Sequence, residues 1–305
     1  MNKGTILLST NSNLDMAAIA RELATFFSLE AKECFTWASI LGALRSVLTA
    51  KGDIFIPNPN AVNILFILVA RMSGKSVVGG IHDAIGHDKK DRSKVFLYNK
   101  ILSRFCYRII FYSEFSRTQF QETYEFSGDM CVYYFGSRLL QGQKTAKKYD
   151  IIMFGRFRKY SGIEEFTKLI REVGSLKVLF VGSSVPLGLE EHGNVTVIRK
   201  YVSDSDLMRL IQATRAVVLP YNSASQSGAV PLAISLGANV VGYDVGGLEE
   251  QFFGVKNFLV RPNSSLVKAI EQAVATDGPD PVEIKRWNKK RLDVNKKNFK
   301  DEWAG

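Results

Sequence analysis

The sequence predicts an α/β protein made of two doubly wound domains. Its 305 residues, 46% of them hydrophobic, are enough for about two packed cores of roughly 150 residues each. Short apolar or β-branched runs alternate with amphipathic segments of helical length in both halves, a pattern typical of βα units around a parallel sheet. A polar, basic, glycine-containing segment at 137–150 separates the halves. We therefore place the domains at 1–148 and 149–280, followed by a basic C-terminal helix at 281–305.

In the first half, the expected strands are short apolar runs, and the expected helices carry apolar residues at helical spacing. The segment 64–72 is apolar nearly all round and is expected to form a buried helix. Ser113 followed by Glu114 predicts a capped helix start directly after a strand. The strands are expected at 4–9, 53–56, 76–81, 108–112 and 130–135, and the other helices at 14–28 and 94–106.

The second half repeats the alternation. Strands are expected at 150–154, 177–182, 195–198, 215–220 and 239–244, and helices at 162–173, 204–212 and 228–236. A last helix is expected from Pro281 to Trp303, with eight Lys or Arg residues against four Asp or Glu residues. This half is therefore also expected to be doubly wound, with a basic helix at its end.

Composition excludes several classes of protein. The three cysteines are far apart and form no CxxC pair, so neither a disulfide framework nor a zinc site is expected, which fits a reducing cytoplasm. The longest apolar run, at 61–70, stops at Arg71, short of the roughly 20 residues that span a bilayer. The first residues have no signal-peptide pattern, so the chain is expected to be soluble and mature. The net charge of +10 points to an anionic partner: nucleotide phosphate, nucleic acid or a lipid surface.

Ligand chemistry in doubly wound domains lies where the strands end and the following helices begin. In the stretch FGRFRKYSGIEEF at 154–166, a strand is expected to end at Phe154 and a helix to begin near Gly162. Arg156, Arg158 and Lys159 then lie at the mouth of the site, where two of them can clamp a pyrophosphate. The alternative is a solvated basic loop.

A second candidate loop is LPYNSASQSGAVPLAISLG at 219–237. The helix expected there exposes the backbone N–H groups of Ser227, Gly228 and Ala229 in its first turn. Gly228 permits close approach of a phosphate, and the helix dipole contributes about 0.3–1 kcal/mol per anionic group. An ordinary loop between a strand and a helix is the alternative. The pair Gly246-Gly247 indicates a tight turn and, alone, nothing more.

In the first half, four polar residues follow an expected strand: His82, Asp83, His87 and Asp88. A metal site would need a further ligand, and the sequence offers no partner for it. We prefer the hypothesis that His82, polarised by Asp83, hydrogen-bonds substrate hydroxyls. The remaining alternative is a buried histidine satisfied by the backbone.

Taken in order, these motifs resemble the GT-B glycosyltransferases, close to the large retaining family 4. The resemblance covers most of the chain. In the second half it rests on FGR with the following GIEE, KVLFVGSS, YVSDSDLMRLIQATRAVVLP, Ser-Gly at a helix start and NVVGYDVGGLEE. In the first half it rests on IHD at 81–83 and IIFYSEFSRTQF at 109–120.

This resemblance implies two Rossmann-like domains that face a central cleft, with the C-terminal helix crossing back to the N-terminal domain. It implies transfer of a hexose-type sugar, with retention, from a nucleotide diphosphate sugar to a glycan or lipid-linked glycan acceptor. The first domain would bind the acceptor and the second the nucleotide sugar. The roles it implies are Arg156, Arg158, Lys159, Ser227 and Gly228 on the diphosphate, Tyr201 and Val202 near the base, Ser225 and Gln226 on the sugar, and His82 with Asp83 at the reaction centre. No metal or other cofactor is expected, because basic groups stabilise the leaving diphosphate.

The sequence departs from the family pattern at two places. Ser161 stands where the family usually has a lysine, and Ala224 and Leu232 stand where it usually has paired glutamates. No acidic residue occurs from 220 to 241. Two alternatives therefore stay open: a non-catalytic binding or scaffold subunit, and a UDP-sugar epimerase. The epimerase is disfavoured, because its chemistry needs acid/base carboxylates.

The surplus charge predicts contact with an anionic membrane. If the helix continues to Arg108, the residues Lys100, Arg104 and Arg108 form one stripe, and Lys285, Lys289, Lys296 and Lys300 form another. Stripes beside Phe96, Tyr98, Trp287 and Phe299 suit an anionic leaflet at about 1 kcal/mol per contacting residue. Solvated helix faces are the alternative, and no recognition motif favours nucleic acid. We therefore expect a cytoplasmic enzyme peripherally associated with the inner face of the cell membrane.

Overall fold

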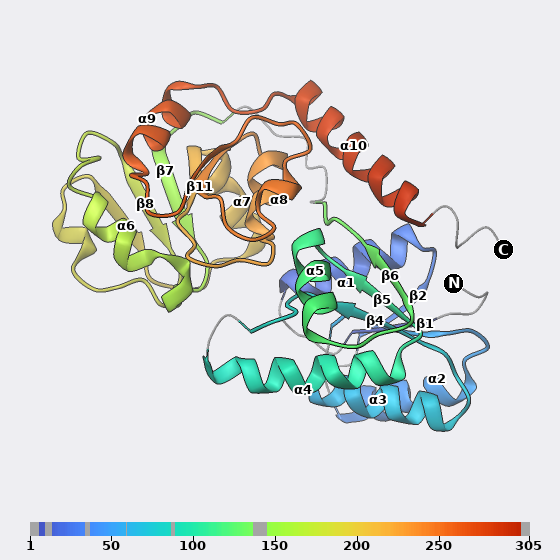
Figure 1. Cartoon of the computed structure of the whole chain (residues 1–305). Helices are drawn as coiled ribbons and strands as arrows, with labels where there is room; N and C mark the ends of the chain where they lie inside the picture. The colour runs from blue at the N-terminus through green and yellow to red at the C-terminus, as the bar shows by residue number, and fades with distance from the viewer. Residues whose placement is uncertain are drawn as a thin grey trace. The chain divides into compact units, whose positions relative to one another are not determined.

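The computed structural model describes residues 6–9, 14–33, 37–58, 60–86, 89–136 and 145–299 of the chain. These residues form two compact units (Figure 1). Unit 1 comprises Met1–Phe135 with Leu292–Gly305, and unit 2 comprises Gly136–Arg291. Each unit contains a six-stranded sheet, and helices pack on both sheets. The predicted α/β class is confirmed.

The sheet of unit 1 is parallel throughout its described strands and has the order β2-β1-β3-β4-β5-β6. Its strands are β1 (Ile6–Ser9), β2 (Glu30–Glu33), β3 (Ile54–Ile56), β4 (Val77–Ile81), β5 (Arg108–Phe111) and β6 (Asp129–Val132). Leu7, Phe55, Val78 and Ile110, from four neighbouring strands, share one buried cluster. The order reverses between β1 and β3, which makes the sheet doubly wound.

The helices of unit 1 are α1 (Leu14–Phe26), α2 (Trp37–Thr49), α3 (Ala61–Met72), α4 (Lys89–Phe105) and α5 (Glu114–Thr123). The predicted capped start of α5 is confirmed, since the Ser113 side chain accepts a hydrogen bond from the Ser116 amide. The prediction that α3 is buried all round is wrong. Only one face of α3 is buried, and Leu65, Leu68 and Met72 are exposed.

The sheet of unit 2 is also parallel and has the order β12-β11-β10-β7-β8-β9. Its strands are β7 (Tyr149–Phe154), β8 (Val178–Val181), β9 (Val195–Ile198), β10 (Thr214–Leu219), β11 (Asn239–Tyr243) and β12 (Phe258–Val260). Counted from β7, this is the 3-2-1-4-5-6 order of Rossmann domains. The order reverses between β7 and β10, so a crevice is expected outside the carboxyl ends of these two strands.

Short helices cover both faces of this second sheet. They are η1 (Lys159–Ser161), α6 (Ile163–Leu169), η2 (Leu189–Glu191), α7 (Asp204–Gln212), α8 (Ala229–Ser235), η3 (Glu249–Gln251) and α9 (Val267–Ala275). Successive residues of β7 alternate between two cores: Ile151 packs in the cluster that contains Phe166 of α6, and Ile152 in the cluster that contains Val230 of α8. This alternation follows from the period of two in a strand.

The last helix, α10 (Pro281–Phe299), connects the two units through buried side chains. Asp280 caps its start, because its carboxylate accepts hydrogen bonds from the amides of Val282 and Glu283 at 2.7 and 2.8 Å. In unit 2, the Trp287 indole N–H donates to the Gln251 carbonyl. In unit 1, Asn295 makes two hydrogen bonds with the backbone of Tyr134. The expectation that the C-terminal helix returns to the N-terminal domain is confirmed.

The structure corrects both basic stripes. Helix α4 ends at Phe105, and Arg108 lies on β5, 7% exposed and ion-paired with Asp129. Trp287 and Phe299 are buried in the cores and cannot lie on a membrane-facing stripe. Lys100 and Arg104 are exposed as predicted. Lys300 lies outside the described residues. None of the helices in the described ranges is long and apolar enough to span a membrane.

Candidate functional site

Four loops of unit 2 meet at the carboxyl edge of its sheet. They follow β7, β8, β10 and β11 and comprise residues 155–162, 182–184, 220–228 and 244–251. The Asn222 amide donates to the Tyr160 carbonyl at 2.9 Å, and the Phe157 amide donates to the Ser184 hydroxyl at 3.0 Å. The Gly247 amide donates to the carbonyl of Ala224. These contacts form one continuous surface at the reversal of strand order, where Rossmann domains bind ligands.

The first loop presents three cations to solvent. Arg156, Arg158 and Lys159 are all exposed, as the sequence predicts. Gly162 has φ +68 and packs so closely on the Pro220 carbonyl that a Cβ there would collide with it. The buried Ser161 donates a hydrogen bond to the Arg158 carbonyl at 2.6 Å. Ser161, where the family usually has a lysine, thus shapes the loop that carries the basic residues.

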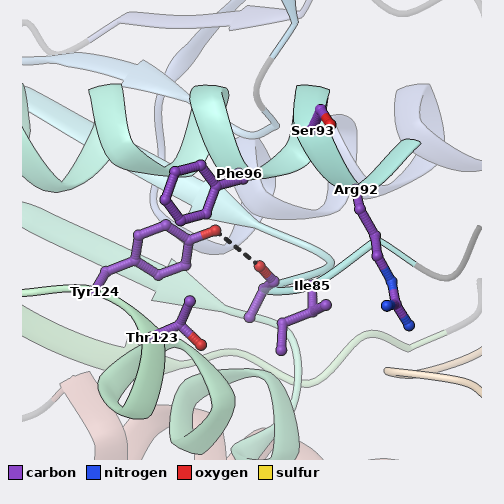
Figure 2. Close-up of a pocket in the computed structure, with 7 residues that line it drawn as sticks. Ile85, Arg92, Ser93, Phe96, Thr123 and Tyr124 are labelled. Carbon is purple, nitrogen blue, oxygen red and sulfur yellow. Dashed lines mark hydrogen bonds between the residues drawn. The ribbon is translucent and has the colours of Figure 1, made fainter. Parts of the chain in front are cut away.

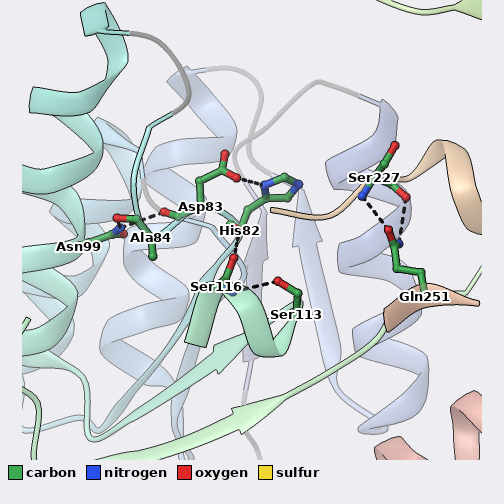
Figure 3. A network of polar contacts seen from close by, with 8 residues as sticks. All are labelled: His82, Asp83, Ala84, Asn99, Ser113, Ser116, Ser227 and Gln251. Carbon is green, nitrogen blue, oxygen red and sulfur yellow. Dashed lines mark hydrogen bonds and ion pairs between the residues drawn. The ribbon is translucent and has the colours of Figure 1, made fainter. Parts of the chain in front are cut away.

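The loop at 220–228, after β10, is anchored by a glutamine that the sequence analysis missed. The Gln251 side chain accepts a hydrogen bond from the Ser227 amide and donates one to the Ser227 carbonyl, both at 2.9 Å (Figure 3). The Ala229 amide donates to the Ser227 hydroxyl at 3.2 Å. The prediction that the Ser227 and Ala229 N–H groups are offered to a ligand is therefore wrong. Gly228 is exposed, and the space where its Cβ would stand is open.

Ser225 and Gln226 precede this helix start and are both buried. The Ser225 hydroxyl has no hydrogen-bond partner among the described residues. A buried hydroxyl without a partner is uncommon in native proteins, because the loss of its hydration is not compensated. Ser225 is therefore suited to hydrogen-bond a ligand that enters this loop.

The loop after β9 positions an aromatic ring at the surface. Tyr201 is 70% exposed, whereas Val202 packs against the core of unit 2. Just before them, the Arg199 guanidinium makes two hydrogen bonds to the Glu190 carboxylate, at 2.7 and 2.6 Å. These bonds hold the pKa of Glu190 at about 2. The structure thus makes the Tyr201 ring accessible and uses Val202 for packing.

A carboxylate contacts the loop after β10, although residues 220–241 contain no acidic residue of their own. The Asn222 side chain donates a hydrogen bond to Glu165 of α6 at 3.4 Å. Burial and the nearby Glu165 charge raise the pKa of Tyr243. Sequence spacing around 220–241 could not reveal Glu165, because it lies on a different βα unit.

In unit 1, His82 and Asp83 follow β4, and their side chains contact each other. The His82 Nδ1 and Asp83 Oδ1 atoms are 2.9 Å apart, and their side chains are 30% and 27% exposed (Figure 3). The alternative of a buried histidine satisfied by backbone is wrong, since the ring is accessible and its partner is a carboxylate. A carboxylate at Nδ1 orients the imidazole and favours a proton on that nitrogen. His87 and Asp88 lie outside the described residues.

Two buried polar residues hold the backbone of this loop. The Ser116 hydroxyl donates to the His82 carbonyl at 2.8 Å. The Asn99 side chain donates to the carbonyls of Asp83 and Ala84, both at 3.0 Å. The sequence analysis missed Asn99 and Ser116. Within the described ranges, no group of three or more His, Cys, Asp or Glu residues could hold a metal ion.

Comparison with solved structures identifies the architecture. The whole chain superimposes on Anabaena Alr3699/HepE, solved in complex with UDP and glucose, with a TM-score of 0.69, 14% identity and full coverage of both chains. The fold is GT-B. Sucrose-phosphate synthase from Thermosynechococcus elongatus has the same fold, with a TM-score of 0.65, 14% identity and coverage of 98% of this chain and 95% of that one. The predicted GT-B architecture is confirmed.

Sequence comparison finds a family that part of the chain resembles. Residues 148–276 match the family Glycosyl transferases group 1. A curated relative, the GDP-mannose:glycolipid 4-beta-D-mannosyltransferase of Xanthomonas campestris pv. campestris, is 28% identical over 109 residues. That match covers 32% of this chain and 31% of the relative, so the chain spans about a third of that protein's length. The glycosyltransferase resemblance is thus supported in unit 2, the part that carries the four loops.

Proposed function

We propose that the chain is a glycosyltransferase that takes a hexose-type sugar from a nucleotide diphosphate sugar. The observation that carries the proposal is the position of the basic loop and the Ser225–Gly228 segment, on either side of the β7/β10 reversal. This reversal lies within the residues that match the glycosyltransferase family. Nucleotide sugars also occur in the names of similar proteins: UDP-glucose with HepE and GDP-mannose with the Xanthomonas relative.

In this proposal, Arg156, Arg158 and Lys159 bind the diphosphate. Their exposed cationic groups neutralise the charge that develops as the sugar departs, with bidentate hydrogen bonds from arginine. Ser227 and Gly228 border the same site, through a hydroxyl and an open backbone surface. We propose that these groups act without a metal or other cofactor, and we therefore expect turnover to persist in excess chelator.

The remaining donor contacts involve the loop after β9 and the segment before α8. The exposed ring of Tyr201 can stack on the base, while Val202 fixes the loop beneath it. The unpartnered hydroxyl of Ser225, with Gln226 beside it, is suited to the hydroxyls of the sugar. Both residues lie in the segment that lacks the paired glutamates of the family.

We assign His82 to the reaction centre, with Asp83 as the residue that orients it. The Asp83 carboxylate orients the His82 ring, and the hydrogen bonds to the His82 and Asp83 carbonyls hold the backbone of the loop. A group that contacts reacting atoms must be held in this way. Retention of anomeric configuration is proposed from the resemblance to family 4. Nuclear magnetic resonance of the product measures the configuration directly.

For the acceptor we propose a lipid-linked glycan of a surface polysaccharide, bound by unit 1 at the cytoplasmic face of the cell membrane. Two observations support it: the Xanthomonas relative is named for a glycolipid acceptor, and α4 exposes Phe96 and Leu97 together with Lys100 and Arg104. Binding to vesicles that rises with anionic lipid and falls with salt is expected. Binding independent of both would contradict the membrane assignment.

The test of the proposed function is a transfer assay. Purified protein is incubated with UDP- and GDP-linked hexoses and a lipid-linked glycan extract, and release of nucleoside diphosphate and labelled glycolipid is measured. We expect turnover with at least one donor. Nucleotide binding without consumption of any donor would instead favour the non-catalytic subunit, and interconversion of the free donor would favour the epimerase.

A further inference from the structure

A groove of about 390 Å³ lies on unit 1. Ala84 and Ile85, which follow His82 and Asp83 in the chain, form part of its lining. It is formed by the segment that follows β4, the first half of α4 and the end of α5 (Figure 2). Its volume falls in the range of about 300–1,000 Å³ that is common for small-molecule sites. Of its lining residues, only Phe96 has a role assigned above, as an exposed apolar side chain of α4.

One wall of the groove is apolar and well supported. Phe96 and Ile85 are 48% and 39% exposed. The Phe96 ring packs on Tyr124 with centroids 5.5 Å apart (Figure 2). Tyr124 in turn stacks on the buried Phe120 at 4.6 Å. The Tyr124 hydroxyl donates to the Ala84 carbonyl at 3.2 Å, so its polar atom is already paired within the protein. The Phe96 ring, supported in this way and about half exposed, suits an apolar ligand.

The rim of the groove is basic. The exposed Arg92 lines its mouth and donates a hydrogen bond from Nε to the Gly86 carbonyl at 3.4 Å. Lys100 is exposed on the same helix, and its ammonium lies 6.0 Å from the centre of the Phe96 ring. An apolar wall beneath arginine and lysine side chains is complementary to an amphiphile with a hydrocarbon chain and an anionic head.

The groove lies next to the His82 loop along the chain. Ala84, which lines it, is two residues from His82. Asn99 of α4 holds the Asp83 and Ala84 carbonyls, so the same helix carries the groove wall and fixes the His82 loop. A ligand in the groove therefore lies against Ala84, in the segment that Asn99 holds.

We propose that this groove holds the hydrocarbon chain of an anionic lipid acceptor, a prenyl or acyl chain joined to phosphate, with the phosphate against Arg92. The inference rests on the proposed function and deepens it, because it assigns the lipid part of the acceptor to a single-chain site. The groove holds a single hydrocarbon chain, and this distinguishes the proposed site from general contact of α4 with a membrane leaflet.

The test uses geranyl phosphate, a short prenyl phosphate, at concentrations where it is monomeric, and measures binding by isothermal titration calorimetry. Ser93→Phe and Thr123→Phe place a ring in the groove from exposed helix positions and should weaken binding at least tenfold. Arg92→Gln should weaken geranyl phosphate but leave geraniol unchanged. Two matched controls, Leu97→Ala and Arg104→Gln, remove an exposed apolar and an exposed basic residue of α4 outside the groove lining and should leave binding unchanged.

Each outcome decides the proposal. Equal binding by the wild type and both phenylalanine variants, with unchanged melting temperatures, would overturn the groove assignment. Equal losses in Leu97→Ala and Ser93→Phe would show contact with a surface rather than a seat for one chain, and would also overturn it. Wild-type protein that transfers sugar but fails these tests refutes the groove alone. Wild-type protein that passes them but consumes no nucleotide sugar refutes the proposed function alone.

Discussion

The side-chain amide of Gln251 makes two hydrogen bonds to the backbone of Ser227, one to its N–H and one to its carbonyl, each 2.9 Å long. Both residues are buried. The carbonyl of Gln251 in turn accepts a hydrogen bond from the Trp287 indole. A continuous polar connection therefore runs from the C-terminal helix α10 to the loop that begins α8, and it fixes that loop in one conformation.

Replacement of Gln251 by leucine should weaken both the fold and the proposed donor site. The substitution leaves a buried N–H and a buried carbonyl of Ser227 without partners, at a cost of about 1–3 kcal/mol for each group. We expect a lower free energy of unfolding in urea and at least tenfold weaker nucleotide binding. Gln272→Leu, at an exposed position of α9, is the control and should change neither. Nucleotide affinity that survives in Gln251→Leu would show that Ser227 and Gly228 do not contact the ligand.

His82→Ala should reduce kcat by about a hundredfold or more if the imidazole acts at the transition state. Because the ring is partly exposed, the melting temperature should stay near that of the wild type. Asp83→Asn keeps the size of the side chain but removes the charge beside Nδ1, and should give a smaller loss of kcat. Steady-state kinetics with a saturating donor separate these effects from KM. An unchanged kcat in His82→Ala would remove this residue from the reaction centre.

Much of the fold was predictable, because β-branched buried strands and amphipathic helices have clear periodicity. Helices α2 and α9 were missed although both are amphipathic. The missed strands lack a periodic signal. Strand β2 reads Glu-Ala-Lys-Glu and pairs only with β1 among the described strands, so no apolar run marks it. Strand β12 has three residues. The error at Arg108 had a different cause: helical spacing continued across the boundary between α4 and β5, where Arg108 pairs with Asp129.

Part of the candidate site was also predictable. Strand ends and charge located the exposed Arg156, Arg158 and Lys159 and the pair His82 and Asp83. The residues that position them were not predictable, because their partners are remote in sequence. Gln251 is 24 residues from Ser227, and Asn99 is 16 from Asp83. Nor could periodicity show that the Ser227 and Ala229 amides are already bonded within the protein.

The Cys106 thiol should resist alkylation in the folded protein. Burial raises its pKa from 9.0 to about 12, so at pH 9 only about one thiol in a thousand is ionised, against half of an unperturbed thiol. Because the folded-state pKa is the higher one, this burial also makes folding less favourable as the pH rises from 9 to 12. Peptide mass spectrometry after brief iodoacetamide treatment should find Cys106 modified only in denaturant. Rapid labelling of native protein would contradict its burial.

Asn295→Leu should destabilise unit 1. The buried Asn295 side chain accepts a hydrogen bond from the Tyr134 amide and donates one to the Tyr134 carbonyl, both at 2.9 Å. Loss of both bonds leaves two backbone groups unsatisfied, at a cost of about 2 kcal/mol or more. Urea unfolding measures the change, and Lys296→Leu, at the next and exposed position of α10, is the control. Equal stability of the two variants would contradict the assigned role of Asn295.

The central claim is that the loops at the β7/β10 reversal bind a nucleotide diphosphate, and calorimetric titration of the wild type and Arg156→Ala with UDP and GDP tests it most directly. Loss of charge-assisted hydrogen bonds worth about 1.5–3 kcal/mol predicts a Kd that rises about 10- to 100-fold in Arg156→Ala. Arg171→Ala removes an exposed arginine beyond α6, away from these loops, and should bind like the wild type. Equal affinities of Arg156→Ala and Arg171→Ala for the preferred nucleotide, or no binding of either nucleotide by the wild type, would contradict the account.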